Sequence, residues 1–144
     1  MADVHKTVLV PHSAEQMFSL VDEVERYPEF MPWCSGADVK WRTEISTSAT
    51  LHIDYHGLKQ NFTTENVKQF PTFMDIKLVD GPFRHLEGLW RFTPLTGHAC
   101  KIEFRLHYDF DSPLLAKIIA PVFSHIANTF VDAFVERAEK IYRK

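Results

Sequence analysis

The chain has 144 residues, a length typical of one domain built around one core. Hydrophobic residues make up 45% of the chain and aromatic residues 13%, which excludes disorder and supplies ample apolar material for a core. The formal net charge is −3, so the chain lacks the basic excess of proteins that bind nucleic acid mainly through phosphates, and DNA is not an expected partner. We therefore expect a single domain over residues 1–144.

The apolar runs and the cysteines indicate the compartment. No stretch of about eighteen apolar residues occurs, and the short apolar run near the N-terminus lacks a small-residue cleavage site, which argues against export and against a membrane span. Cys34 and Cys100 have no metal-ligand or redox spacing, so both are expected to be reduced thiols. These features predict a cytoplasmic protein.

The N-terminal segment is predicted to be a strand followed by a helix. Valines share one face of residues 4–10 and Pro11 ends the segment, which predicts a strand at a sheet edge. Ser13 and Gln16 form a capping-box pattern, so a helix is expected to begin there and to end by Arg26, because Tyr27 precedes Pro28.

Residues 27–34, with the sequence YPEFMPWC, follow this helix. Two prolines argue against regular secondary structure, and the large apolar side chains predict a rigid hydrophobic loop. The loop is expected to close one end of the core or to form the rim of a binding site, and these two interpretations are compatible.

Apolar and polar residues alternate from Ala37 to Asp109, which predicts an antiparallel sheet of six or seven strands with one face exposed to water. Residues 59–70 are expected to be a strand, but polar residues on both of its faces leave its register open. Gly88 is expected to mark a β-bulge in preference to a close approach of ligand to backbone. The apolar positions expected to face inward are Val39, Trp41, Ile45, Leu51, Ile53, Tyr55, Met74, Ile76, Leu78, Leu86, Trp90, Phe92, Ile102, Phe104, Leu106, Tyr108 and Phe110.

A long helix is predicted at the C-terminus. Ser112 is the expected N-cap and Pro113 the first helical residue, and the helix should run for about thirty residues. Pro121 is expected to bend or interrupt it. Its C-terminal end is basic, with Arg137, Lys140, Arg143 and Lys144.

One helix has to cover the apolar face of the whole sheet, so the sheet must curl around it. The predicted fold is therefore α+β, a curved antiparallel sheet wrapped around a long C-terminal helix, with short helices near the N-terminus. This arrangement tends to leave an apolar cavity suited to a hydrophobic small molecule, although aromatic side chains could instead fill the core. The candidate ligand-binding residues are Phe30, Trp33, Trp41, Tyr55, Phe62, Trp90, Phe104, Tyr108, Phe123, Ile126 and Phe130.

Catalytic and metal-binding patterns give no support to an enzyme. His52 and His56 share a strand face but would stand about 13 Å apart, beyond the reach of one metal ion. No nucleotide-binding, hydrolase or zinc-protease motif occurs. A carboxylate pair would have to come from residues 22–25, which are better explained as a solvated acidic face. No catalytic residue, metal or required cofactor is predicted.

Four segments resemble a known family: residues 27–34, 6–28 (KTVLVPHSAEQMFSLVDEVERYP), 81–94 (GPFRHLEGLWRFTP) and 124–138 (SHIANTFVDAFVERA). The chain resembles the bacterial coenzyme Q-binding START-like family of the polyketide cyclase/dehydrase and lipid transport superfamily, which includes the ribosome association toxins of type II toxin–antitoxin systems. The resemblance covers essentially the whole chain and implies a helix-grip fold. The matching positions are Tyr27, Pro28, Phe30, Pro32, Trp33, Cys34, Gly81, Pro82, Phe83, Gly88 and Trp90.

This resemblance implies two functions. The first is non-enzymatic binding of ubiquinone or a related isoprenoid lipid in the cavity, which supports respiration and would involve transient contact with a membrane surface. The second is binding to the large ribosomal subunit, which blocks subunit joining. The aromatic inner faces favour the first, whereas Arg84, Arg91, Arg105 and the basic helix end give the second weaker support. A polyketide aromatase or cyclase would need an acid/base pair that the sequence does not locate.

Overall fold

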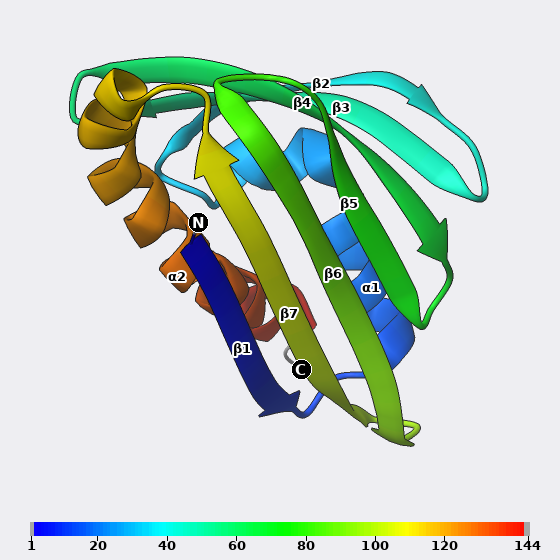
Figure 1. Ribbon diagram of the computed structural model, residues 1–144. Helices are drawn as coiled ribbons and strands as arrows, with labels where there is room; N and C mark the ends of the chain where they lie inside the picture. The colour runs from blue at the N-terminus through cyan, green and yellow to red at the C-terminus, as the bar shows by residue number, and fades with distance from the viewer. Residues whose placement is uncertain (1, 143–144) are drawn as a thin grey trace.

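The structure is a computed structural model that describes residues 2–142. These residues form one seven-stranded sheet, two α-helices and one 3-10 helix (Figure 1). The elements in chain order are β1 (Ala2–Val10), α1 (Ala14–Asp22), η1 (Val24–Glu29), β2 (Cys34–Arg42), β3 (Ser46–Tyr55), β4 (Leu58–Gln69), β5 (Phe73–Asp80), β6 (Phe83–Thr96), β7 (Ala99–Phe110) and α2 (Pro113–Tyr142).

The strands are ordered β1-β7-β6-β5-β4-β3-β2, and every neighbouring pair is antiparallel. Strands β2 to β7 form a meander, while β1 pairs with β7 at the far edge, as predicted for residues 4–10. The α1–η1 segment therefore connects the two opposite edges of the sheet. Figure 1 shows the sheet curving around α2, with α1 on the same side, which confirms the predicted architecture.

Helix α1 begins at the predicted capping box and ends before Arg26, as expected. The Ser13 hydroxyl accepts from the Gln16 amide at 3.1 Å, and the Gln16 side chain accepts from the Ser13 amide at 3.0 Å. The helix ends at Asp22. A 3-10 helix that contains Pro28 follows, so the expectation that the prolines exclude regular structure from residue 27 onward is wrong. The last turn of this segment is closed by the Phe30 amide, which donates to the Tyr27 carbonyl at 3.2 Å, so Pro28 occupies a turn position that needs no amide donor.

A β-bulge in β2 reverses the expected orientation of Trp41. Val39 pairs with Ala49 on the inner face, but the register shifts by one residue and Trp41 then pairs with Ser48 on the outer face. One extra residue in a strand moves all later side chains to the opposite face. Trp41 is consequently 44% exposed, and Ile45, in the turn after β2, is exposed as well, so both predicted inward positions are wrong.

The register of β4 explains why its sequence is polar on both faces. Phe62 pairs with Leu51 of β3, which places Phe62, Thr64, Asn66 and Lys68 on the inner, buried face. Three of these four side chains are polar, and each of the three takes part in a hydrogen bond inside the molecule. The polarity of this inner face removed the alternation that identifies the other strands.

Gly88 lies on the inner face of β6 without a bulge, so the expected bulge is wrong. A Cβ atom at Gly88 would lie 3.1 Å from the carbonyl oxygen of Arg105, 3.2 Å from Leu106 Cδ1 and 3.3 Å from Ile76 Cδ1. Glycine is favoured here because even a methyl group would force the neighbouring strands to shift by a few tenths of an ångström.

Helix α2 runs unbroken from Pro113 to Tyr142, and the Leu115 amide donates to the Ser112 hydroxyl at 3.1 Å as expected of an N-cap. Pro121 does not interrupt it, because the residues around the lost hydrogen bond lie on the exposed side, where water can satisfy the free carbonyl. By length and composition α2 could cross a membrane, a property shared by core helices of soluble proteins. Its buried side chains belong to the core: Ile119, Phe123, Ile126, Ala127, Val131, Phe134 and Ala138.

Candidate functional site

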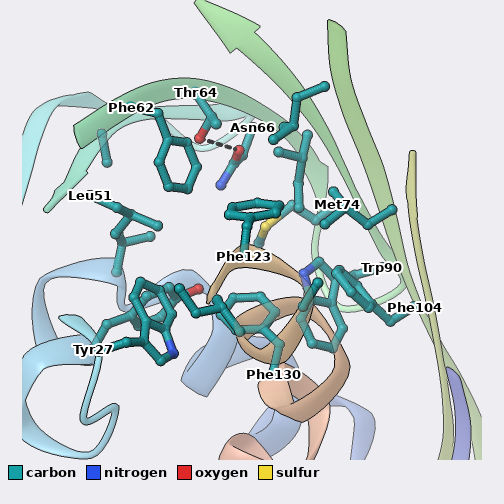
Figure 2. Close-up of a pocket in the computed structure, with 18 residues that line it drawn as sticks. Tyr27, Leu51, Phe62, Thr64, Asn66, Met74, Trp90, Phe104, Phe123 and Phe130 are labelled. Carbon is teal, nitrogen blue, oxygen red and sulfur yellow. Dashed lines mark hydrogen bonds between the residues drawn. The ribbon is translucent and has the colours of Figure 1, made fainter. Parts of the chain in front are cut away.

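A narrow apolar cavity lies between the inner face of the sheet and α2 (Figure 2). Its volume is about 70 Å³, which is smaller than the roughly 150 Å³ of an apolar cavity known to bind benzene. The cavity therefore has room for several solvent-sized groups but not for a substituted ring unless side chains move. Its walls are formed by Val24, Tyr27, Trp33, Ala49, Leu51, Phe62, Thr64, Asn66, Met74, Ile76, Leu86, Trp90, Phe104, Leu106, Phe123, Ile126, Ala127 and Phe130.

The cavity wall contains most of the side chains expected there. Seven candidates line it, namely Trp33, Phe62, Trp90, Phe104, Phe123, Ile126 and Phe130. They come from the loop before β2, from three strands and from α2, so residues distant in sequence meet at one site. Their aromatic rings contact one another, as in the pair Trp90–Phe104, whose centroids are 4.5 Å apart.

The remaining four candidates lie outside the wall. Trp41 is on the outer face because of the β2 bulge. Tyr55 is half-buried and stacks on His125 of α2 at 5.7 Å between ring centroids. Phe30 packs against Phe134 at 5.6 Å, and Tyr108 is buried among aromatic rings without lining the cavity. Alternation predicted which side of the sheet Tyr108 faces, but not how far along the strand the cavity extends.

Residues 27–34 both close the core and form part of the cavity wall, so the two interpretations of this loop hold together. Tyr27, Met31 and Trp33 are buried, and Tyr27 and Trp33 line the cavity. The Tyr27 hydroxyl donates to the Val21 carbonyl at 2.6 Å, which fixes η1 against the end of α1. The expected hydrophobic plug is therefore also one wall of the site.

One side of the cavity is polar. Thr64 Oγ1 donates to Asn66 Oδ1 at 3.1 Å, and both side chains line the cavity (Figure 2). Deeper along β4, the Lys68 ammonium donates to both carboxylate oxygens of Asp22, at 2.9 and 3.0 Å, and to Thr47 Oγ1 at 2.8 Å. Thr64 and Asn66 are not among the site residues predicted from the sequence, because the register of β4 could not be assigned from its pattern. The pairing of Phe62 with Leu51 places both side chains on the inner face.

The cavity wall offers little acid–base chemistry. Among its described residues, Tyr27 is the one with a titratable side chain, and burial raises its pKa well above the ordinary value for tyrosine. Its proton is already donated to the Val21 carbonyl. The wall so described contains no carboxylate or imidazole that could serve as the acid/base pair of a cyclase.

The outer face of the sheet is a second candidate surface. Arg91 of β6 and Arg105 of β7 are exposed there, and neither forms an ion pair within residues 2–142. Arg84 is also exposed but lies 3.5 Å from the Asp109 carboxylate. Arg105 also lines a shallow groove of about 740 Å³, whose walls include acidic, basic and histidine side chains.

The predicted basic end of α2 is less available than expected. The Arg137 guanidinium donates to the Glu29 carboxylate at 2.6 Å and lies 4.9 Å from the centroid of the Phe30 ring. Lys140 is exposed. Arg143 and Lys144 lie outside the described residues.

A family model described as polyketide cyclase / dehydrase and lipid transport matches residues 10–135. The chain belongs to this family. Among its relatives in the family, the ribosome association toxin RatA of Vibrio cholerae is 41% identical over 99% of each chain, and that of Pseudomonas aeruginosa is 40% identical over 96% of each. The mitochondrial coenzyme Q-binding protein COQ10 homolog B of Xenopus laevis is 31% identical over 90% of this chain and 55% of that protein.

Solved structures of low sequence identity share the fold. The Zhui aromatase/cyclase from Streptomyces sp. R1128 superposes with a TM-score of 0.86 at 16% identity, covering 99% of this chain and 96% of that one. A START superfamily protein from Mycobacterium smegmatis superposes with a TM-score of 0.77 at 22% identity, covering 96% and 98%. The curved sheet around α2 is thus a helix-grip fold, and at these identities the likeness concerns the fold alone.

Proposed function

We propose that this protein associates with ribosomes as the toxin of a toxin–antitoxin pair, binding the large ribosomal subunit and blocking its joining with the small one. The proposal rests mainly on similarity of about 40% identity along almost the whole chain to proteins named for ribosome association. The small cavity volume also favours an activity of the outer surface over tight binding of a large ligand. The proposed activity is binding, without catalysis.

Sedimentation tests the proposal. Lysate from bacteria that overproduce the protein would be separated on a sucrose gradient. We expect the peak of joined ribosomes to fall, the free-subunit peaks to rise, and the protein to sediment with the large subunit. An unchanged profile, with the protein remaining at the top of the gradient, would contradict ribosome association.

Charge reversal identifies the surface involved. Arg91→Glu with Arg105→Glu removes two outer-face cations that form no ion pair within residues 2–142. Contact with ribosomal RNA phosphates should therefore weaken and co-sedimentation should fall, most strongly at low salt, where charges are least screened. The matched control, Lys59→Glu with Lys117→Glu, makes the same charge change at the start of β4 and on α2. Equal losses in the two double variants would mean that net charge, not this face, matters.

A second candidate function is the binding of a quinone-like or isoprenoid lipid in the cavity. The apolar wall and the similarity to a protein named for coenzyme Q binding favour it. Because the cavity is narrow, a ring would enter only if α2 side chains such as Phe123 and Phe130 moved aside. No cofactor is needed for folding in this proposal.

Tryptophan fluorescence tests this second function. Trp33 and Trp90 line the cavity and Trp41 is exposed, so Trp41→Phe leaves two reporters, both at the site. We expect a short-tail quinone to quench them with a dissociation constant on the order of micromolar. Solvent extraction of the purified protein and mass spectrometry should reveal a bound lipid. Absence of both quenching and bound lipid would count decisively against cavity binding.

A further inference from the structure

We propose that Asn66 is a specificity-determining residue of the cavity, which selects guests that carry a carbonyl or ether oxygen by donating a hydrogen bond from Nδ2. This inference rests on the second candidate function, the binding of an apolar molecule in the cavity. It adds the orientation of the guest: the oxygen-bearing end lies against β4, and the apolar remainder lies among the aromatic side chains.

The first step is the position of Asn66. It lies on the inner face of β4, opposite Thr47 of β3 and Ile76 of β5, and is only 8% exposed. Its carbonyl oxygen accepts from the Thr64 hydroxyl at 3.1 Å, which orients the amide. Figure 2 shows the amide nitrogen on the cavity side of this hydrogen bond. Within residues 2–142, Nδ2 itself has no hydrogen-bond acceptor.

The second step is the contrast with the other buried polar groups nearby. Lys68 makes three hydrogen bonds, to Asp22 and Thr47, and Tyr27 donates to a carbonyl, so both groups are satisfied by the protein. Buried polar groups in folded proteins are almost always paired. Among the described residues, the fully buried side-chain polar atom without a partner is Arg137 Nε, outside the cavity wall. Asn66 Nδ2 keeps some accessible surface and makes no hydrogen bond within the protein, so it is free to donate to water or to a guest in the cavity.

The third step is the chemistry of the acceptor. The indole N–H groups of Trp33 and Trp90 belong to the same wall and also lack hydrogen-bond partners within the described part of the chain. Indole and amide N–H groups donate and do not accept. A cavity with free donors in an otherwise apolar wall complements ketones, quinones and ethers, and it discriminates against pure hydrocarbons of the same shape.

A near-isosteric pair of probes tests the inference. Acetophenone carries a carbonyl where α-methylstyrene carries a methylene group, and binding of each would be measured by tryptophan fluorescence in the Trp41→Phe background. We expect Asn66→Leu to weaken acetophenone binding about tenfold and to leave α-methylstyrene binding unchanged or improved, because leucine has a similar volume but no donor. Equal effects on both probes would overturn the proposed role of Asn66 while leaving cavity binding intact.

A spectroscopic readout avoids dependence on the folding of the variant. In the wild-type protein, the NMR signals of the Asn66 side-chain amide, assigned by their loss in Asn66→Leu or Asn66→Ala, should move when acetophenone is added and not when α-methylstyrene is added. Signals that move equally with both probes, or with neither while both probes bind, would overturn the proposed hydrogen bond from Nδ2. If the wild-type protein binds neither probe, both this inference and the second candidate function fail.

Discussion

At the scale of single residues, Gly88 shows how close packing constrains one position. A Cβ atom at Gly88 would approach backbone and side-chain atoms of both neighbouring strands to between 3.1 and 3.3 Å. We expect Gly88→Ala to lower the free energy of unfolding by about 1–2 kcal/mol, measured by urea denaturation. Gly97→Ala is the matched control, because no atom lies within 4 Å of its Cβ position, and it should change stability by less than about 0.5 kcal/mol. Similar losses in both variants would contradict the packing explanation.

The two cysteines give a second prediction at this scale. Burial raises the pKa of the Cys34 and Cys100 thiols to about 11, so near pH 8 only about one molecule in a thousand carries a thiolate at either position. Thiol reagents should therefore react slowly with the native protein and rapidly with both cysteines in guanidinium chloride, as counted by mass spectrometry. Rapid labelling of either cysteine in the native protein would show that it is not protected by burial.

At the scale of secondary-structure elements, the ion pair between Lys68 and Asp22 joins β4 to α1. The Lys68 side chain is 5% exposed and that of Asp22 is 23% exposed, so removal of the cation leaves a carboxylate largely shielded from water. We expect Lys68→Met to cost about 3 kcal/mol of unfolding free energy, and Asp22→Asn to recover part of that loss in the double variant. Both changes would be measured by urea denaturation.

The control for this prediction is a pair of surface ion pairs in η1 and at its N-cap, Glu23. Arg26 pairs with Glu23 and Glu29, and all three side chains are about half exposed. Arg26→Met should cost less than about 1 kcal/mol, because exposed pairs are screened by water. If Lys68→Met and Arg26→Met had equal effects, burial would not be the source of the contribution of Lys68.

At the scale of the whole molecule, the two candidate functions use different regions and can be separated. Ala127 lines the cavity, so Ala127→Leu should fill empty space with little loss of stability, abolish quinone quenching and leave ribosome co-sedimentation unchanged. Ala138 is buried on the same helix but outside the cavity wall, so Ala138→Leu should instead cost about 1–3 kcal/mol through overpacking. Loss of co-sedimentation in Ala127→Leu would mean that ribosome association depends on the cavity.

The sequence by itself determined the strands with clear alternation and the N-terminal ends of the two α-helices, which Ser13 and Ser112 cap. It also determined the edge position of residues 4–10 and the need for the sheet to curl around one helix. These features depend on local periodicity and on the supply of apolar surface, both of which can be counted along the chain. The same counting placed five of the seven confirmed wall residues, Trp90, Phe104, Phe123, Ile126 and Phe130, on the inner face of a strand or helix. Trp33 lies in a loop and Phe62 in the strand whose register was open, so periodicity did not place these two.

Only the tertiary structure decided the features that arise from contacts between strands. The bulge that turns Trp41 outward, the register that brings Asn66 inside and the close approach that favours Gly88 each depend on the neighbouring strand. Cavity volume is a further example, because it is the small difference between the space that the curved sheet encloses and the volume of the side chains that fill it. The sequence pattern gives neither the space enclosed by the sheet nor how completely the side chains fill it. The small volume of the cavity therefore became known only once every side chain was placed.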